Sequence, residues 1–539
     1  MTDRHRWQPW LLALCVAAAS ALAYANAGEG EFLYDDLPYI RNNPVVVAGN
    51  VSLAFTQPLP PDQPQLALFR PLTVASWALQ ARWCGFDARW FHAVNVLLHA
   101  MVAALVVGLG LALGLAPGGV LVAGLLFAVH PAHVESVAWI TGRSELLATL
   151  FLLCALLAWL RGRSPRARLG AMLACLAAAL LSKETAFTFP LLLLIVAGAA
   201  AQRGLRPTVA LLGSLGLIGL VALWRIAVLG RFSPDAHLAP FVNAPILERT
   251  LIPLDLLARY VALMAWPAGL RVFYHRTEFG VPGVGHLLLL ALLAATIVIA
   301  LRRDRRLALL LLWFVAALLP VLNIVPIQET FAERFTYLPS IGWCLFLGQA
   351  IAHLGRLERA RLGSLASAVL IPAAAVLLLL TLTIQRNRDW RTSLTLWEAQ
   401  ARAAPQFAYS HYQLGYYYRD RNIIEPTSAA QRGAIAEFLE SLRLDPNHRY
   451  AEEAHRELGK LLMQKQQWQN AAYHFQEALR FDADDFTALI NLIYCDDYLH
   501  RLTVEQRREL LEHAHRVAPD DDARRRVEEQ QSRPSPPGK

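Results

Sequence analysis

The chain has 539 residues, of which 55% are hydrophobic and only 17% charged, and its formal net charge is +8. A soluble protein of this length could not cover its surface with so apolar a sequence, so a wholly soluble protein is excluded. Apolar runs fill residues 1 to about 385, and most arginines there lie in the short loops between them. The distribution of positive charge therefore indicates how the chain is oriented in the membrane. The net charge does not indicate nucleic-acid binding.

These runs predict an all-α membrane bundle of about eleven spans, each needing about 20 residues. Residues 1–27 place Arg4 and Arg6 before an apolar stretch, which predicts a first membrane helix or signal-anchor. The small residues Ala25-Asn26-Ala27 leave a cleaved signal peptide as the alternative. Residues 250–270 are interpreted as a re-entrant or interfacial helix. The remaining spans are expected near 93–113, 118–132, 141–160, 166–182, 186–202, 208–230, 284–301, 307–325, 338–354 and 366–385.

Four arginine-dense loops set the orientation, because such loops stay on the cytoplasmic side. If residue 1 is cytoplasmic, they all fall inside: 161–168, 202–206, 302–306 and 356–361. The first loop (28–92) and the region after 386 are then extracytoplasmic, as are nearly all carboxylates, histidines and lysines at the boundaries of the core (93–385). Nucleotide-activated donors do not cross membranes, so a site on that face would need a donor anchored in the bilayer. The short loops and the Ala/Leu/Arg bias favour a bacterial plasma (inner) membrane, with the C-terminal region periplasmic.

Residues 386–525 show the small and large positions of a tetratricopeptide repeat, a pair of helices repeated along a solenoid. One unit carries Leu458-Gly459, Leu462, Ala471, Phe475 and Ala478. Such stacks leave a concave groove that binds extended peptides, although a spacer or assembly platform fits the same pattern. The tail 526–539 is expected to be disordered.

Seven segments then occur in order along the chain: "YDDLPYIRNNPVV" (34–46), "FRPLTVASWALQ" (69–80), "HAVNVLLHA" (92–100), "FAVHPAHVESVAWITGRSELLATLF" (127–151), "SKE" (182–184), "NIVPIQETFAERFTYLPSIGWCLFL" (323–347) and "RNRDWRTSLTLW" (386–397). Together they resemble the transmembrane and tetratricopeptide-repeat O-mannosyltransferases, a family of the GT-C class of lipid-sugar-dependent glycosyltransferases. The resemblance implies a GT-C membrane bundle and transfer of a sugar, mannose in eukaryotic members, from polyprenyl phosphate to Ser/Thr of an exported protein. Few repeats and the insertion at 59–65 depart from the family and leave the acceptor open.

Transfer from a lipid phosphate is a displacement at the anomeric carbon through an oxocarbenium-like transition state. Because a phosphate leaves as an anion, the site needs cations near it and a carboxylate base for the acceptor hydroxyl. The family pattern puts Asp35 and Asp36 at the catalytic position. We predict Asp35 as the base and Asp36 as a capping or supporting residue, with the reverse order and a purely structural pair as alternatives.

Further candidates lie in the other extracytoplasmic segments. Glu135 could serve a second acidic role, toward acceptor or metal, while His130 and His133 cap helix ends or bind the donor. A divalent cation is allowed but not required, because His-Pro-Ala-His is a weak ligand pattern. Lys183 is expected at the carrier phosphate or, alternatively, in an internal pair with Glu184 at a hairpin tip.

Arg334 is the first choice for the phosphate, since a planar guanidinium can fork two of its oxygens; snorkelling to lipid headgroups is the alternative. Arg70, Arg143 and Arg225 are further phosphate candidates. The residues expected to line the pocket are Tyr39, His92, Asn95, His130, His133, Glu184, Glu329 and Tyr337.

The sequence thus predicts partners of three kinds: a polyprenyl-phosphate-linked sugar, an exported acceptor protein held by the repeats, and membrane lipid. Two other functions stay open. The same chemistry could serve a lipid or polysaccharide acceptor, and a non-catalytic scaffold could assemble exported proteins on the repeats. A transporter is disfavoured, because the ionisable groups gather at one membrane face and not at the midplane.

Overall fold

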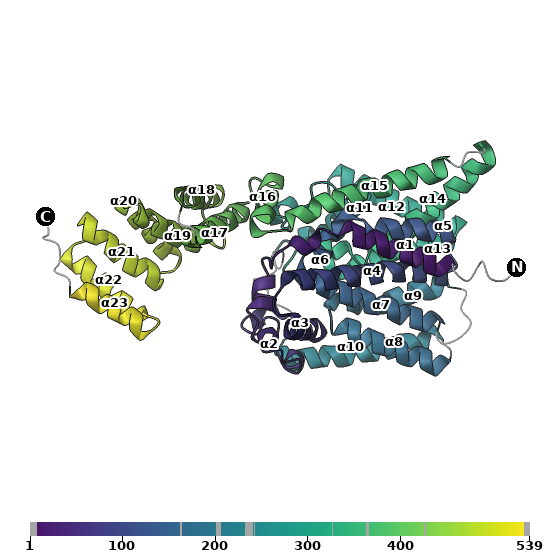
Figure 1. The fold of residues 1–539 in the computed structure, drawn as a ribbon, viewed down its shortest axis with the longest axis horizontal. Coiled ribbons are helices and arrows are strands. Elements are labelled where there is room, and N and C mark those ends of the chain that lie inside the picture. The colour runs from purple at the N-terminus through teal and green to yellow at the C-terminus, as the bar shows by residue number, and fades with distance from the viewer. Residues whose placement is uncertain are drawn as a thin grey trace. The chain divides into compact units, whose positions relative to one another are not determined.

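The computed structural model describes residues 8–161, 164–200, 206–231, 241, 243–325, 327–362, 366–424 and 427–532. These residues form helices and connecting turns, with no strand among them. The chain divides into two compact units, Met1–Thr392 and Ser393–Lys539 (Figure 1). The predicted all-α fold is therefore confirmed for the part of the chain that is described.

Thirteen helices of the first unit matter for the site or the membrane: α1 (Gln8–Ala23), α3 (Pro71–Cys84), α4 (Ala88–Ala112), α5 (Pro117–Ala128), α6 (Val134–Val137), α7 (Arg143–Arg161), α8 (Pro165–Leu180), α9 (Phe189–Ala199), α10 (Pro207–Leu229), α11 (Ile246–Ala265), α12 (Val284–Arg303), α13 (Arg305–Leu318) and α15 (Ala366–Asp389). With them lie α2 (Pro44–Val47) and α14 (Ser340–Leu362). In Figure 1, α1 lies beside α4, and α4 beside α7.

Six helical segments among the described residues are long and apolar enough to cross a membrane: Pro9–Glu29, Ala88–Ala112, Ile140–Arg161, Pro207–Leu229, Val284–Arg303 and Val369–Asp389. A seventh span results if the pair Pro117–Ala128 and Pro131–Val137, bent by 51°, counts as one. These helices indicate an integral membrane protein. They confirm the spans predicted near 10–27, 93–113, 141–160, 208–230, 284–301 and 366–385.

About eleven spans are not shown among the described residues, where several of the predicted runs form helices shorter than about 20 residues. The predicted spans at 166–182, 186–202 and 307–325 correspond to α8, α9 and α13, which have 16, 11 and 14 residues. In the run 307–325, Pro320 falls in a 3₁₀ turn that follows α13, and proline cannot continue a helix. In the run 338–354, only Ser340–Leu354 of α14 is apolar. A hydropathy profile detects an apolar run but does not show where a helix ends within that run.

Small and polar residues bring α5 and α14 together. Gly119 and Gly348 face each other so closely that a methyl group on Gly348 would meet the backbone of α5. Beside them, the Gln349 side chain accepts a hydrogen bond from Ala116 N at 3.0 Å and donates one to Ala116 O at 3.2 Å. Close backbone approach and a polar side chain are the usual means of holding membrane helices together, since lipid gives them no hydrophobic drive.

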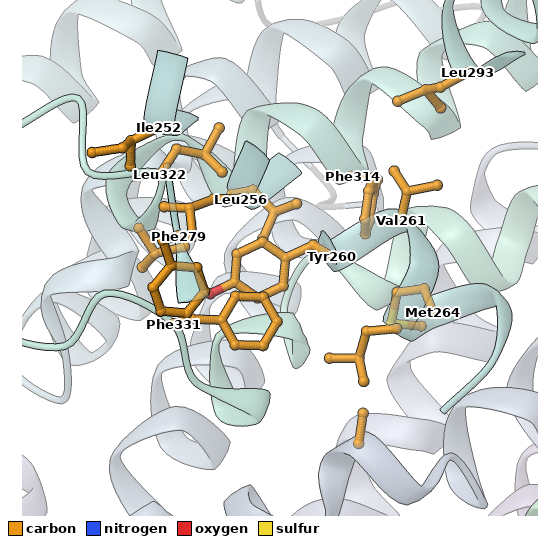
Figure 2. Close-up of a cluster of buried hydrophobic side chains, with 14 of the residues drawn as sticks. Ile252, Leu256, Tyr260, Val261, Met264, Phe279, Leu293, Phe314, Leu322 and Phe331 are labelled. Carbon is orange, nitrogen blue, oxygen red and sulfur yellow. The ribbon is translucent and has the colours of Figure 1, made fainter. Parts of the chain in front are cut away.

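An aromatic cluster anchors the loop before α14 (Figure 2). The rings of Tyr260 (α11) and Phe331 stack with centroids 4.3 Å apart, and Phe279 lies on Phe331 at 5.9 Å. The Tyr260 hydroxyl accepts a hydrogen bond from Ala332 N at 3.4 Å. Two residues further on, this loop presents Arg334, so the cluster fixes the position of a candidate phosphate ligand.

The second unit consists of α16 (Ser393–Ala403), α17 (Ala408–Ile424), α18 (Ser428–Leu444), α19 (Ala451–Gln464), α20 (Trp468–Phe481), α21 (Phe486–Leu499), α22 (Val504–Val517) and α23 (Asp521–Gln531). Its helices pack as consecutive pairs, as the repeat pattern predicts. Gly415 lies against the Phe438 ring and Gly459 against Phe475, so the small position of one helix receives the large position of the next. Helix α23 extends to Gln531, into the segment 526–539 expected to be disordered, whose residues 533–539 are not described.

Candidate active site

Asp36 fastens the first loop to the start of α7. Its buried carboxylate accepts hydrogen bonds from Thr141 N at 2.8 Å, from Thr141 Oγ1 at 2.6 Å and from Leu33 N at 2.9 Å. Burial raises the pKa of Asp36 to about 7, although these hydrogen bonds oppose the rise. These three hydrogen bonds engage both carboxylate oxygens of Asp36, and its supporting role stays a prediction.

Asp35 is different, because no described residue donates a hydrogen bond to its half-buried carboxylate. Burial raises its pKa to about 7; Arg334 lowers it, Glu329 and Asp36 add to the rise, and Arg70 lowers it further. The preceding residue, Tyr34, has a φ of 47°, a left-handed conformation that is costly for a bulky side chain. The backbone is thus held in a strained conformation at the residue next to a carboxylate with free lone pairs.

Arg334 lies in the same electrostatic environment as Asp35. It forms an ion pair with the fully buried Glu135, and its backbone N donates to Glu135 Oε2 at 2.8 Å. The guanidinium lies over the rings of Trp139 and Phe335, at 5.4 and 5.1 Å from their centroids. Burial alone would lower the pKa of Arg334, yet Glu135 and Glu329 outweigh burial and raise it, so the residue stays charged.

Two glutamates of the same loop behave differently. Glu329 is half-buried, has no hydrogen-bond partner among the described residues, and its pKa is raised by burial. Glu333 is fully buried and accepts hydrogen bonds from Arg271 N, from the Tyr274 hydroxyl at 3.1 Å and from Arg386 at 3.5 Å. Glu333 is therefore part of the framework, whereas Glu329 acts on Asp35 through its charge, which raises the pKa of Asp35.

The lysine and the glutamate of the "SKE" segment have separate partners. Lys183 pairs with the buried Glu145 at 2.5 Å, so the alternative of an internal Lys183–Glu184 pair is wrong. Glu184 instead bridges Arg70 at 3.0 Å and Arg225 at 2.7 Å. Burial lowers the pKa of Lys183 to about 8, which Glu145 counteracts. Lys183 is thus neutralised by Glu145, whereas Arg70 and Arg225 share one carboxylate and together keep a net positive charge.

Arg143 and Asn95 hold the turn that carries Trp139. Arg143 is buried, donating from Nε to Asn95 Oδ1 at 2.9 Å and from Nη2 to Phe91 O at 3.0 Å. The Asn95 amide donates to Trp139 O and Ile140 O at 3.1 and 3.2 Å. These contacts give both residues a structural part and leave Arg143 poorly disposed to reach a phosphate.

The histidines stabilise helix ends. His99 contacts the Tyr337 hydroxyl at 2.7 Å and Ala128 O at 3.1 Å. His133 contacts Phe127 O and Ser340 Oγ, both at 2.9 Å, and His130 accepts a hydrogen bond from Ala132 N at 3.3 Å. His92 is buried, with neither ring nitrogen bonded to a described residue. Among those residues, no group of three or more His, Cys, Asp or Glu side chains could hold a metal ion.

Tyr39 is also buried, and burial raises the pKa of its hydroxyl, with the charge of Asp35 adding to the rise and Arg70 opposing it. Electrostatic interactions therefore link Asp35 with Tyr39, Arg70, Glu329 and Arg334, and an ion pair links Arg334 with Glu135. Sequence reasoning missed Thr141, Trp139 and Glu145. Their stretch, "WITGRSE", lies within the segment 127–151 that carries the family resemblance, and that resemblance is the signal that could have found them.

These contacts also gather the ends of several membrane helices. The first loop follows α1 and is joined to the start of α7, while the Arg334 loop precedes α14 and is joined to α6. Lys183, just before α9, meets the start of α7 through Glu145. Segments predicted to share one membrane face are therefore in contact, in a polytopic helical membrane protein in which the Asp35 carboxylate and the Arg334 guanidinium influence each other electrostatically.

The chain is homologous to protein O-mannosyl-transferases at about 25% identity. It is 25% identical over 455 residues to one from Caenorhabditis elegans, covering 81% of this chain and 63% of the relative. It is 26% identical over 574 residues to Tmtc3 of Drosophila melanogaster, with 89% and 56% covered. It is 26% identical over 476 residues to TMTC4 of Homo sapiens, covering 76% of this chain and 64% of the relative. The chain thus spans between about half and two-thirds of these relatives' lengths. No protein-family model matches it.

The two aspartates should differ in their effect on stability. Asp36→Asn replaces one acceptor oxygen with an amide that cannot accept, so a buried donor loses its partner at a cost of about 1–3 kcal/mol. Asp35→Asn removes no hydrogen bond to a described residue and should leave stability unchanged or slightly higher. Apparent unfolding temperatures in detergent, at one scan rate, would test this. A lower unfolding temperature for Asp35→Asn than for Asp36→Asn would contradict these structural roles.

Proposed function

We propose that the protein is an integral-membrane glycosyltransferase that moves a sugar, mannose by analogy with its relatives, from a polyprenyl-phosphate carrier to Ser/Thr hydroxyls of exported proteins. The observation that carries this proposal is that Asp35, a carboxylate with no hydrogen-bond donor among the described residues, lies within electrostatic reach of the Arg334 guanidinium. Homology to proteins named as O-mannosyl-transferases supports the reaction class.

In the proposed reaction the acceptor oxygen attacks the anomeric carbon of the sugar. The bond from that carbon to the phosphate oxygen breaks, and the phosphate leaves with the bonding electrons. Asp35 removes the hydroxyl proton as the new glycosidic bond forms, and Arg334 offers two N–H groups to the departing phosphate. Glu135 orients the guanidinium through its ion pair, which assigns it a positioning part in place of the second acidic role expected from the sequence.

The other cations would act at longer range. Arg70 already influences the charge of Asp35, and Lys183 lies over the Phe335 ring at 5.8 Å, next to Arg334. Because each is paired with a carboxylate, each adds less net positive charge than the sequence implies. We propose the extracytoplasmic side for the pocket, on the argument from the arginine-dense loops. The proposed mechanism does not require a divalent cation in addition to these positively charged side chains.

An alternative is the same chemistry with a lipid or polysaccharide acceptor. Paired helices with Gly–Phe contacts, such as Gly459 against Phe475, favour the protein acceptor, because repeats of this kind bind extended peptides. A non-catalytic scaffold would also use the repeats, but it gives no reason for an unpaired carboxylate beside a buried arginine.

Asp35→Asn should abolish sugar transfer in purified protein, with a loss of at least about 100-fold, since general bases contribute about 10²–10⁴-fold. The wild-type rate at limiting donor should rise with pH through a midpoint at about 7 and level off above it, because Asp35 must be deprotonated to act. Glu329→Gln removes a charge that raises this pKa, so the midpoint should move to lower pH. Transfer from synthetic polyprenyl-phosphate sugar to a Ser/Thr peptide measures both. Full activity of a folded Asp35→Asn variant would end the assignment.

Sidedness has a direct reporter in the first loop. Asn50-Val51-Ser52 matches the acceptor pattern for N-glycosylation, and Asn50 is exposed. Produced in a eukaryotic endoplasmic reticulum, the protein should carry a glycosidase-sensitive glycan that Asn50→Gln removes. An unmodified chain whose C-terminal unit is cut by protease from the cytosolic side would show the reverse orientation.

Removing residues 393–539 should separate the two acceptor classes. The truncated chain keeps all the pocket residues named above, so transfer to a short Ser/Thr peptide should persist, while transfer to a full-length acceptor protein should fall at least about tenfold if the repeats supply effective concentration. A lipid or polysaccharide acceptor predicts unchanged transfer to that acceptor. Loss of peptide transfer as well would mean that the second unit is needed for the site itself.

A further inference from the structure

The segment Arg386–Arg391, which comprises the end of α15 and the two residues after it, packs within the first unit against the chain that precedes Asp35. The Asn387 amide donates to Ala23 O at 2.9 Å and to Asn26 Oδ1 at 2.8 Å. Further along, Glu31 N donates to Arg391 O at 3.0 Å. The segment therefore holds the stretch from the end of α1 to Asp35 at several points.

The same segment also holds the loop of Arg334. Arg386 contacts the carboxylate of Glu333, the residue before Arg334, at 3.5 Å. Trp390 is buried, at 2% exposed, and its ring lies on Trp139 with centroids 5.9 Å apart. Trp139 in turn lies beneath the Arg334 guanidinium at 5.4 Å, and its indole N–H donates to Leu33 O at 3.4 Å. Trp139 thus touches both the arginine and the loop of the aspartate.

We propose that Trp390 is a positioning residue for the transfer reaction, acting through Trp139 to keep Arg334 and Asp35 at a fixed separation. The inference rests on the proposed function, because it assigns these two residues to phosphate and base. Packing of this kind transmits displacement, since protein interiors have few voids and a lost ring lets its neighbours move. A displacement of about 1 Å at reacting groups can cost about 100-fold in rate.

Trp159 provides a matched control. It is also a buried tryptophan whose indole N–H has no partner among the described residues, as is true of Trp390. It lies on α7, sixteen positions after Arg143, and a helix rises about 1.5 Å per residue, so Trp159 is about 24 Å from the pocket end of that helix. The same substitution at both sites separates positioning from core packing.

The experiment compares Trp390→Leu, Trp390→Phe and Trp159→Leu in full-length protein in detergent. We expect Trp390→Leu to lower kcat/KM at least tenfold, Trp390→Phe to restore most of it, and Trp159→Leu to change it less than threefold per folded molecule. Independently of activity, amide hydrogen exchange at residues 31–36 and 333–336 should become faster in Trp390→Leu and stay as in wild type in Trp159→Leu.

Unchanged exchange in both loops of Trp390→Leu overturns the inference, as does an activity loss no larger than that of Trp159→Leu. If the wild-type protein transfers no sugar, the proposed function fails, and exchange alone then decides the structural claim. Faster exchange in both loops supports the claim that Trp390 sets their position, whereas unchanged exchange overturns it.

Discussion

The buried carboxylate of Asp36 is the constraint on which the pocket depends. Its three hydrogen bonds join Leu33 in the first loop to Thr141 at the start of α7, across more than 100 residues of sequence. A buried carboxylate is tolerated only when donors satisfy it, so the loop and the helix must meet at this point. Asp35 is adjacent in the chain, and its position follows from that of Asp36. Asp36 thus holds the loop in place, and Asp35 keeps its carboxylate free of hydrogen bonds from the described residues.

Ion pairs hold the cations of the site in place. Arg334, Lys183, Arg70 and Arg225 each have a carboxylate partner, and breaking a buried pair typically costs about 3–5 kcal/mol. A cation held in this way is fixed in place, which suits a group that must meet a charge developing only in the transition state. Asp35 and Glu329 are the pocket carboxylates without hydrogen-bond donors among the described residues, and both have raised pKa values. Both carboxylates are influenced by the charge of Arg334, which is consistent with a base for proton removal close to a cation that can bind a phosphate.

Much of this arrangement could be predicted from the sequence, and the exceptions have physical causes. Long apolar runs gave correct spans, because length and hydropathy determine whether a helix can cross a bilayer. The predicted spans are longer than the observed helices where a residue such as Pro320 ends a helix within an apolar run. Composition does not show where a helix ends. The repeat pattern gave correct helix pairs, since Gly459 and Phe475 make their contact within one unit. The acidic doublet Asp35-Asp36 was singled out by the family pattern, and its part in catalysis stays a prediction.

Partners distant in sequence could not be predicted. Glu184 stands beside Lys183 in the chain, but Lys183 pairs with Glu145, because consecutive side chains at a turn diverge and the start of α7 lies nearer. Thr141 and Trp139 carry no local signal of their roles, which exist only once the first loop and the Arg334 loop meet at that turn. Sequence reasoning therefore identified the reactive residue types, whereas the structure identified which of them are free.

The most direct measurement is a structure of the protein bound to a non-transferable phosphonate analogue of a polyprenyl-phosphate sugar. If Arg334 binds the phosphate and Asp35 is the base, we expect phosphonate oxygens within about 2.7–3.2 Å of the Arg334 guanidinium. We expect the anomeric carbon to face Asp35. A phosphonate bound away from Arg334, or a sugar whose anomeric carbon is shielded from Asp35, would contradict these assignments.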